Sequence, residues 1–361
     1  MKKILIILFF SFIFVLFSIL TYLTIFGFET DKFNSLLEKK VSQNQLGFKI
    51  NLEKIKVKID LKKMSFYITT PKPKVKYEDT KIDLKRIDAY VDFNSLIINQ
   101  PEIYKVNISS EDIKINDIKK IVRYLKPSTL KKFLLNEVYN GEANFNAELN
   151  LQENKIKDYE INGFVKNFSI KIQNNQIKKT SFIYLIKKNS GELNNIRGTI
   201  DGFQINSGYL SYKKEDKLKL SGNLKSDFKL DKDNFNNFIK EDYLKTFSNL
   251  DAFGSLTNKF EVIFDKTLKI SNYNFNIDGN IKNSKINLIN PEKFKFINNE
   301  IKTIDFEKVN FVFDLNNSSQ KKIDLSGLYK INNKNFNKFK LSNVFKENYN
   351  KLKVSADYDN G

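Results

Sequence analysis

The sequence of 361 residues contains no cysteine and no histidine. These absences exclude thiol nucleophiles, Cys/His zinc sites, haem ligation by histidine and every catalytic triad that uses imidazole. Without cysteine there are no disulfides, so cysteine usage does not report the redox compartment. The G-x-x-x-x-G-K-[ST] phosphate loop and the G-x-S-x-G nucleophile elbow are also missing. We expect no catalytic residue, no metal site and no cofactor.

Arginine is almost absent although the chain is basic. Lys plus Arg is 61 against 42 acidic residues, a formal charge of +19, yet only Arg86, Arg123 and Arg197 are arginines. Proteins that read nucleic acid use arginine for bidentate base and phosphate contacts. Abundant Lys, Ile and Asn are what an A/T-rich genome encodes by default. We therefore expect no nucleic-acid partner, and keep a lysine-rich polyanion-binding surface as a weaker alternative.

The acidic residues do not form an evident acid/base pair. Asp88, Asp92, Glu142 and Glu148 alternate with aliphatic residues in stretches that look like strands. A solvated outer face is the expected role for such residues. The 33 Phe and 16 Tyr fall mostly on apolar rows, which favours lining or core over base stacking. An enzyme is not the expected function.

A long apolar run follows Met1-Lys2-Lys3. Residues 4–26 carry no charge, and about 20 apolar residues span a bilayer. The run is longer than the apolar part of a cleavable signal peptide, and no A-x-A pattern follows it. We predict a cytoplasmic tip (1–3) and a single-pass inner-membrane anchor (4–26). Lys2 and Lys3 then keep the N-terminus in the cytoplasm, and the rest of the chain lies in the periplasm of a two-membrane bacterium.

The remainder is organised as strands with a few helices. Residues 28–47 predict a short amphipathic helix, with Thr30 or Asp31 as its N-cap and Gly47 at its end. Residues 48–361 predict a β domain with helical insertions near 116–139 and 231–250. Strands recur about every 8–12 residues with short polar turns, which is typical of antiparallel strands that follow one another.

Alternating strands put an apolar row on one face of the sheet, as LEKIKVKIDL (52–61) illustrates. About four short helices cannot cover one face of so long a sheet, so it either packs on itself as a dry sandwich or barrel, or curls into an open trough. We predict the trough: a mainly β fold, with an N-terminal transmembrane helix followed by a long curled antiparallel β-sheet that forms an open β-groove. The candidate lipid-lining residues are Ile55, Val57, Ile59, Leu61, Phe66, Ile68, Ile87, Ala89, Val91, Phe93, Phe145, Ala147, Leu149, Ile170, Ile172, Leu218, Leu220, Val262, Phe264, Ile277, Ile281, Ile286, Leu288, Phe311 and Phe313.

Two segments resemble each other without gaps. They are YEINGFVKNFSIKI (159–172) and FNIDGNIKNSKINL (275–288), which share a Gly and, three residues later, Lys-Asn. Shorter echoes are KLKLSGNLKS (217–226) and KIDLSGLYKI (322–331). Each is an alternating strand that reaches a Gly and continues, and Gly inside a strand often marks a bulge or bend. A repeated unit that extends the sheet in one direction is the interpretation we prefer to chance similarity.

The start of the chain also resembles a known family. An anchor and a short helix lead into LGFKINLEKIKVKIDLKKMSFYIT, and later into DLKRIDAYVDFNSLIINQPEIYKVNISSEDIKI, with the turn Pro101-Glu102-Ile103. This order is similar to that of the AsmA-like proteins, which include the TamB and YhdP groups; Phe48 departs from the basic residue common there. The resemblance is clearest over residues 1–115. It implies an anchored periplasmic β-groove without catalytic residues that moves phospholipid toward the outer membrane.

These patterns define the expected function and its alternatives. We expect a protein that binds phospholipid or another acyl-chain lipid, associates with the inner membrane, and contacts outer-membrane or envelope proteins. The main alternative is an anchored β-sandwich or jelly-roll scaffold or assembly factor, including an LptC-like lipopolysaccharide-transport component. The chain ends VSADYDNG within a strand pattern, so we expect it to be an N-terminal fragment of a longer protein.

Overall fold

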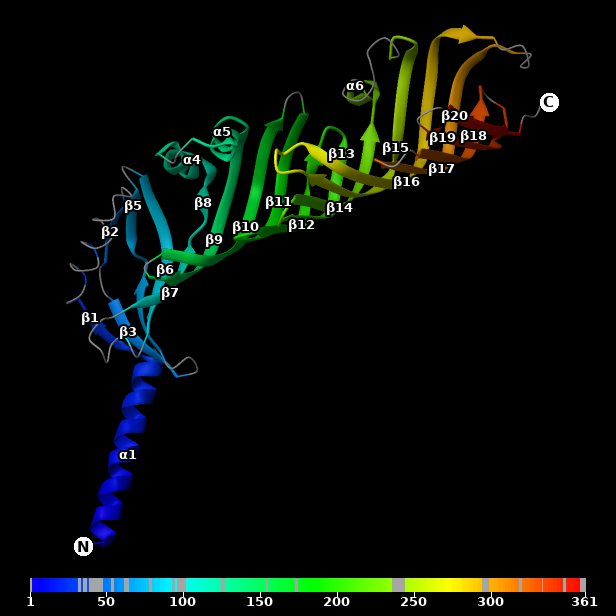
Figure 1. Ribbon diagram of the computed structural model, residues 1–361. Helices are drawn as coiled ribbons and strands as arrows, with labels where there is room; N and C mark the ends of the chain where they lie inside the picture. The colour runs from blue at the N-terminus through cyan, green and yellow to red at the C-terminus, as the bar shows by residue number, and fades with distance from the viewer. Residues whose placement is uncertain are drawn as a thin grey trace. The chain divides into compact units, whose positions relative to one another are not determined.

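The structure is a computed structural model. It describes residues 2–31, 34, 38, 48–52, 55–61, 65–77, 80–92, 95, 102–124, 127–153, 155–172, 175–235, 244–293, 299–317, 320–332, 334–346 and 349–357. The strands form one long antiparallel sheet of 20 strands, accompanied by few helices (Figure 1). The prediction of a mainly β fold, with a long antiparallel sheet after an apolar helix, is confirmed.

The helices are α1 (Lys2–Ile25), α4 (Ile115–Tyr124), α5 (Thr129–Asn136) and α6 (Lys232–Phe235). The strands are β1 (Phe28–Thr30), β2 (Phe48–Asn51), β3 (Ile55–Asp60), β4 (Ser65–Pro71), β5 (Lys74–Tyr77), β6 (Thr80–Val91), β7 (Ile103–Ser110), β8 (Ile113–Lys114), β9 (Val138–Gln152), β10 (Lys155–Ile172), β11 (Asn175–Lys187), β12 (Ser190–Ile200), β13 (Phe203–Lys214), β14 (Leu218–Leu230), β15 (Phe247–Phe264), β16 (Ile270–Glu292), β17 (Ile301–Asn316), β18 (Gln320–Ile331), β19 (Asn337–Lys346) and β20 (Tyr349–Ala356).

The N-terminal helix α1 covers residues 4–25 of the predicted anchor (4–26). Its residues Ile7–Ile25 are long and apolar enough to cross a membrane, and none of that stretch is buried against the rest of the protein. The hydroxyls of Ser18, Thr21 and Thr24 each donate to the carbonyl four residues earlier at 2.8 Å. These bonds satisfy polar side chains in a segment that otherwise offers them no partner. An N-terminal apolar helix of this kind fits a signal anchor or a signal sequence.

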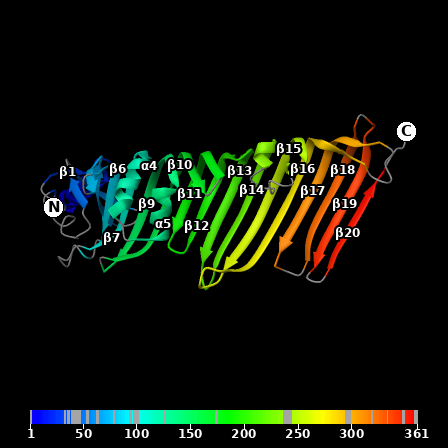
Figure 2. The ribbon, with the colours of Figure 1, turned by 90° about the horizontal axis from the view of Figure 1, so that it is seen from above.

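The chain forms two compact units. The first comprises residues 1–136, 140–164 and 185–188. In it, β1, β3, β4, β6, β7 and β9 pair antiparallel in that order, while β5 joins β2 to the first half of β6. Its core contains Val75, Tyr77, Ile82 and Leu84, and Ile121 of α4 packs on it. Helices α4 and α5 therefore lie over one face of these strands (Figures 1 and 2).

The predicted helical segments are found in part. The range 116–139 contains α5 and all of α4 except Ile115, and its last two residues already belong to β9. In the range 231–250 the described residues include the single turn α6, a helical Leu244 and the start of β15, while 236–243 lie outside the described residues. The range 28–47 begins with β1, which pairs with β3, and within it the described residues Asn34 and Glu38 are helical, as predicted. Most of that range is outside the described residues.

The second unit comprises residues 137–139, 165–184 and 189–361. From β12 to β20 each strand pairs antiparallel with the next one in the sequence, so these strands lie side by side in chain order (Figure 2). Short turns connect some of them, among them β13 to β14 and β15 to β16. In the turn from β15 to β16, the Asp265 carboxylate accepts bonds from Thr267 N at 2.8 Å and Lys269 N at 3.1 Å.

The strands of the second unit bend along their length (Figure 1), and two neighbouring strands, β16 and β17, carry bulges. Lys282 is an extra residue in β16 opposite the Phe253–Gly254 step of β15. On the adjacent strand β17, Lys308 has a φ of +53° where the register with β18 shifts. A bulge bends its strand and increases the local twist. Two bulges at the same level of neighbouring strands therefore bend the sheet at that level.

The internal similarity in the sequence corresponds to this irregularity. The Lys-Asn pair of 275–288 contains the bulged Lys282. The aligned pair in 159–172 contains Asn167, which has a φ of +50°. Both segments lie within a long strand, β10 and β16. The shared Lys-Asn thus marks a backbone bend within a strand in both places.

Candidate functional site

One face of β14–β20 is mainly apolar, interrupted by Ser226, Asn258 and Asn343, and we call it the apolar face. Register partners on successive strands lie directly beside one another on the same face. One row across seven strands is Ser226, Leu256, Gly279, Phe311, Leu325, Leu341 and Val354. The next row is Leu224, Asn258, Ile277, Phe313, Ile323, Asn343 and Leu352.

The opposite face of the same strands is polar. Its central row is Lys225, Thr257, Asp278, Val312, Asp324, Ser342 and Lys353. Its side chains bind one another: Asn280 Nδ2 donates to Asn310 Oδ1 at 3.0 Å, and Lys322 Nζ lies 2.5 Å from Asp324 Oδ2. The hydrogen bond from Lys322 lowers the pKa of Asp324 and raises that of Lys322. This surface is suited to water, so the sheet is amphipathic.

The apolar face is most covered around α6. Phe228, Leu230, Ala252 and Phe311 are buried there, and Phe235 of α6 packs on them. At β20, Leu352 and Val354 are 56% and 62% exposed. Apolar surface open to water is stabilised by any apolar partner that covers it, by about 25 cal/mol per Å². The face can thus take a hydrocarbon chain, and it offers few polar groups that would fix one position.

The predicted lining residues of the first unit also share a face. Pairing of β1, β3, β4, β6, β7 and β9 aligns the row Phe28, Val57, Ile68, Ala89, Val106 and Leu149. Ile59, Phe66 and Val91 form a second row beside it. All of the first row except the exposed Phe28 is half-buried. We call the row from Phe28 to Leu149 the first-unit row.

Other predicted lining residues of the first unit are covered. Ile87 and Phe145 pack against the core that Ile121 of α4 closes. Ile55 is 0% exposed and Ala147 is buried. Their alternation places them on the apolar side, but helix and strand packing leaves them little contact with any ligand. Leu61 lies in the turn after β3 and is exposed.

In the second unit, the predicted residues lie on the apolar face or extend it. Leu218 pairs with Phe264 and Leu220 with Val262. Further along, Ile281 pairs with Val309, Ile286 with Ile304, and Leu288 with Phe247. Ile277, Phe311 and Phe313 belong to the two rows given above. Ile170 is buried in β10, Phe93 lies outside the described residues, and nothing is described of the Ile172 side chain.

Sequence reasoning missed several members of the apolar face, among them Leu224, Leu256, Leu325, Leu341 and Val354. The signal was present. Leu224 and Leu325 lie in the two alternating echoes 217–226 and 322–331. Following the alternation through those segments would have found both.

Two of the four acidic residues that alternate with aliphatic residues, Asp88 and Glu148, pair with cations, and the Asp92 carboxylate accepts a bond from Ser95 N at 2.9 Å. Asp88 lies on the polar side of β6 but its side chain is 5% exposed, not solvated as expected, and Arg86 Nε lies 3.0 Å from its Oδ2. Lys105 Nζ lies 2.5 Å from Glu148 Oε2. Among the described residues, no group of three or more acidic side chains is placed to hold a metal ion.

Two tyrosines stack beside Asp88. The Tyr67 and Tyr90 rings have centroids 5.1 Å apart. Burial, and then the Asp88 charge, raises the pKa of each phenol. Deprotonating either ring would place a second negative charge near a buried carboxylate, so both stay neutral and serve as packing surface.

Comparison with known proteins gives no relative. No protein-family model, no curated protein and no solved structure matches this chain.

Proposed function

We propose that this chain is an AsmA-like, inner-membrane-anchored periplasmic protein that binds phospholipid acyl chains along its apolar sheet faces. In this proposal it moves phospholipid between the inner and outer membranes and so supports outer-membrane assembly or integrity. The observation that carries the proposal is the pair of apolar rows across β14–β20, with a polar row on the opposite face.

The amphipathic sheet accounts for both binding and movement. Each methylene group that leaves water for the apolar face is stabilised by about 0.8 kcal/mol. Successive strands offer similar aliphatic and aromatic groups, so an acyl chain has nearly the same free energy at neighbouring positions. Head groups stay in water beside the face. A lipid can then shift along the sheet without one deep minimum that would trap it.

The N-terminal helix supplies the membrane end. Ile7–Ile25 can span a bilayer, and Lys2 and Lys3 precede it. Positive residues stay on the cytoplasmic side. This orientation puts both sheet units in the periplasm, where lipid has to cross an aqueous gap.

The alternative of a sandwich or jelly-roll scaffold differs in what covers the apolar face. In such a fold a second sheet packs about 10 Å away on the same face. From β12 to β20 the described strands pair only as neighbours in one sheet. A scaffold function would need an envelope protein, not lipid, on that face.

Photocrosslinking in cells tests the proposal with the full chain. A benzophenone amino acid replaces Phe313 or Leu341 on the apolar face, and Asn310 or Ser326 on the polar face, one position at a time. Irradiation of cells grown with labelled phosphate should give phospholipid adducts from the first pair only. Mass spectrometry of the adducts would identify the lipid.

Two outcomes contradict the proposal. Equal lipid labelling from both faces would mean non-specific contact with membrane. Protein adducts without lipid adducts at Phe313 and Leu341 would favour the scaffold. Asn310 is a matched control because it precedes Phe311 on the same strand and faces the opposite side.

A further inference from the structure

The end of α1 is joined closely to the sheet. Only Phe26 and Gly27 separate Ile25, the last helical residue, from Phe28, the first residue of β1. Gly27 has a φ of +75° and donates its N–H to Tyr22 O at 3.1 Å. A Cβ on Gly27 would lie 2.7 Å from Lys58 Cγ and 2.9 Å from Val57 O. Only glycine fits both this backbone conformation and this close approach to β3.

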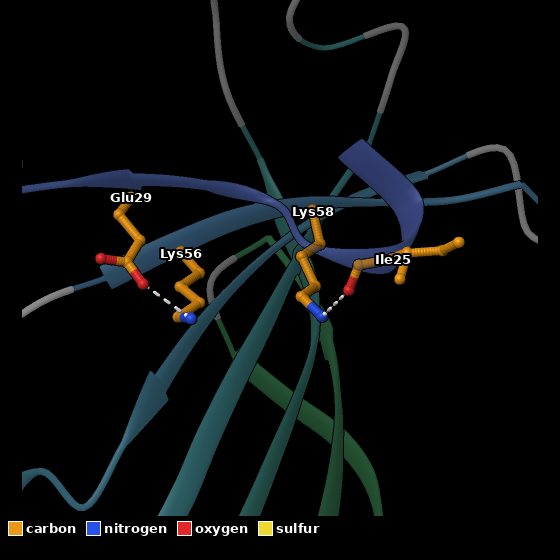
Figure 3. Close-up of polar contacts among 4 residues, drawn as sticks. All are labelled: Ile25, Glu29, Lys56 and Lys58. Atoms are coloured by element: carbon orange, nitrogen blue, oxygen red, sulfur yellow. Dashed lines mark hydrogen bonds and ion pairs between the residues drawn. The ribbon is translucent and has the colours of Figure 1, made fainter. Parts of the chain in front are cut away.

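Two lysines of β3 make polar contacts with this junction, one with the helix end and one with β1. Lys58 Nζ donates to the carbonyl oxygen of Ile25 at 2.8 Å, and Lys56 Nζ lies 2.7 Å from Glu29 Oε1 (Figure 3). The last carbonyls of a helix lack intrahelical donors, and a lysine favours the negative end of the helix dipole. Three register pairs between β1 and β3 complete the junction. Direct contacts therefore join the helix end to β1 and β3.

The first-unit row begins at this junction. Phe28 is 60% exposed and pairs with Val57. At the helix end, Tyr22 and Phe26 are 56% and 62% exposed, with ring centroids 5.4 Å apart. Exposed aromatic rings at the end of an apolar helix are typical of the membrane–water interface. Phe28 follows two residues after Phe26, so the apolar row starts where the bilayer ends.

We propose that this junction is the entrance through which acyl chains pass from the bilayer onto the first-unit row. Gly27 and Lys58 are positioning residues that hold Phe28 at the bilayer surface. The inference rests on the function proposed above and specifies where lipid enters: from the leaflet in which α1 ends. A gap between the bilayer and the first-unit row would expose the methylene groups of the acyl chain to water during transfer. The short junction between α1 and β1 removes that gap.

The test uses the full chain reconstituted in vesicles that contain a phospholipid with a photoreactive acyl chain. After irradiation at timed intervals, mass spectrometry measures labelling of the peptides that carry Val57, Ala89 and Leu149. Insertion of Gly-Ser-Gly-Ser after Phe26 keeps the anchor but releases the row from the interface. The labelling rate should fall at least tenfold. The same insertion after Asp216, in the turn between β13 and β14, is the matched control and should label at the unaltered rate.

Point variants test the positioning residues. Lys58→Met retains the aliphatic stem but loses the bond to Ile25 O, and should slow labelling severalfold. Lys56→Met leaves the helix end untouched and should label normally. If the insertion variant or Lys58→Met is labelled as fast as the unaltered chain, the proposed entrance is wrong.

A second lipid source separates this inference from the proposed function. A short-chain photoreactive phospholipid, supplied as monomers in solution, needs no contact with the bilayer. It should label the unaltered chain and the insertion variant equally, which also shows that the variant is folded. Failure of the unaltered chain to label from either source would contradict lipid binding itself. Normal monomer labelling with bilayer uptake unaffected by the insertion would overturn the entrance alone.

Discussion

The ring of Phe311 lies on Gly279, its register partner on the neighbouring strand. A Cβ on Gly279 would collide with Phe311 Cζ and lie 2.5 Å from the carbonyl oxygen of Ser255. The absence of a side chain at this position lets an aromatic ring lie flat on the apolar face. Gly279 thus leaves room on β16 for the Phe311 ring of the neighbouring strand.

Replacing Gly279 with valine should destabilise the protein by about 1–3 kcal/mol, because the added side chain must displace the Phe311 ring or the β15 backbone. Urea unfolding followed by circular dichroism measures this change. Lys225→Ala, an exposed substitution on β14, should stay within about 0.5 kcal/mol. Equal stability of the valine variant and the unaltered chain would mean that Phe311 does not rest on Gly279.

Arg86 compensates a buried charge on β6. The Asp88 side chain is 5% exposed and its partner Arg86 is 59% exposed, with 3.0 Å between Nε and Oδ2. Arg86→Met leaves the buried carboxylate, whose register partners are Thr69 and Asn107, without its cation. We expect a loss of about 2 kcal/mol, below the range for fully buried pairs because water screens the arginine side.

Lys81→Met on the same strand is the control for charge removal. Lys81 Nζ lies 2.7 Å from Asp83 Oδ1, but both side chains are more than half exposed. Its loss should change stability by less than about 0.5 kcal/mol. If both variants unfold at the same urea concentration, the burial of Asp88 has no energetic consequence.

Alkaline titration should reveal late-ionising tyrosines. Burial raises the pKa of Tyr67, Tyr90 and Tyr184 above the ordinary 10.0, and the Asp88 charge adds to the shift for the first two. Folding favours the neutral phenols. Their contribution to the stability of the fold is therefore present below the ordinary pKa and is lost as the pH rises through the raised pKa values. Phenolate absorbance should therefore develop in two phases.

Asp88→Asn separates the effect of burial on the tyrosine pKa values from that of the Asp88 charge. It should move Tyr67 and Tyr90 toward the ordinary pKa and leave Tyr184, whose shift comes from burial alone, as an internal reference. Phenylalanine substitutions assign each phase to its residue. A single phase at the ordinary pKa would show that these rings are solvated.

Local periodicity was sufficient to predict which residues share a face. Val57 and Ile68, or Ile277 and Phe313, are paired across strands as the alternation requires. The side-chain period of a strand is two wherever it lies, so this information is entirely local. The apolar helix at the N-terminus was predictable for the same reason.

Which residues of an apolar row are buried could not be predicted locally, because burial depends on contacts between residues far apart in the sequence. Ile87 alternates as well as Val57 does, but only the folded chain brings Ile121 of α4 against that part of the core. Phe28–Thr30 forms a strand because β3 supplies register partners about 27 residues later. Likewise the burial of Asp88 follows from its neighbours and not from its position in the pattern.

The turn from β15 to β16 gives an acid-dependent prediction. Bonds from the Thr267 side chain first, then from Lys269 N, lower the pKa of the exposed Asp265 carboxyl below its ordinary 3.8. A lowered folded pKa contributes stability that is present above the ordinary value and is lost as the pH falls through the lowered one. Asp265→Ala should lower the melting temperature at about pH 6 and flatten its decline toward about pH 3. Asp216→Ala, in the exposed turn between β13 and β14, should leave the pH profile unchanged. An acid decline as steep in Asp265→Ala as in the unaltered chain would show that this carboxylate does not close the hairpin.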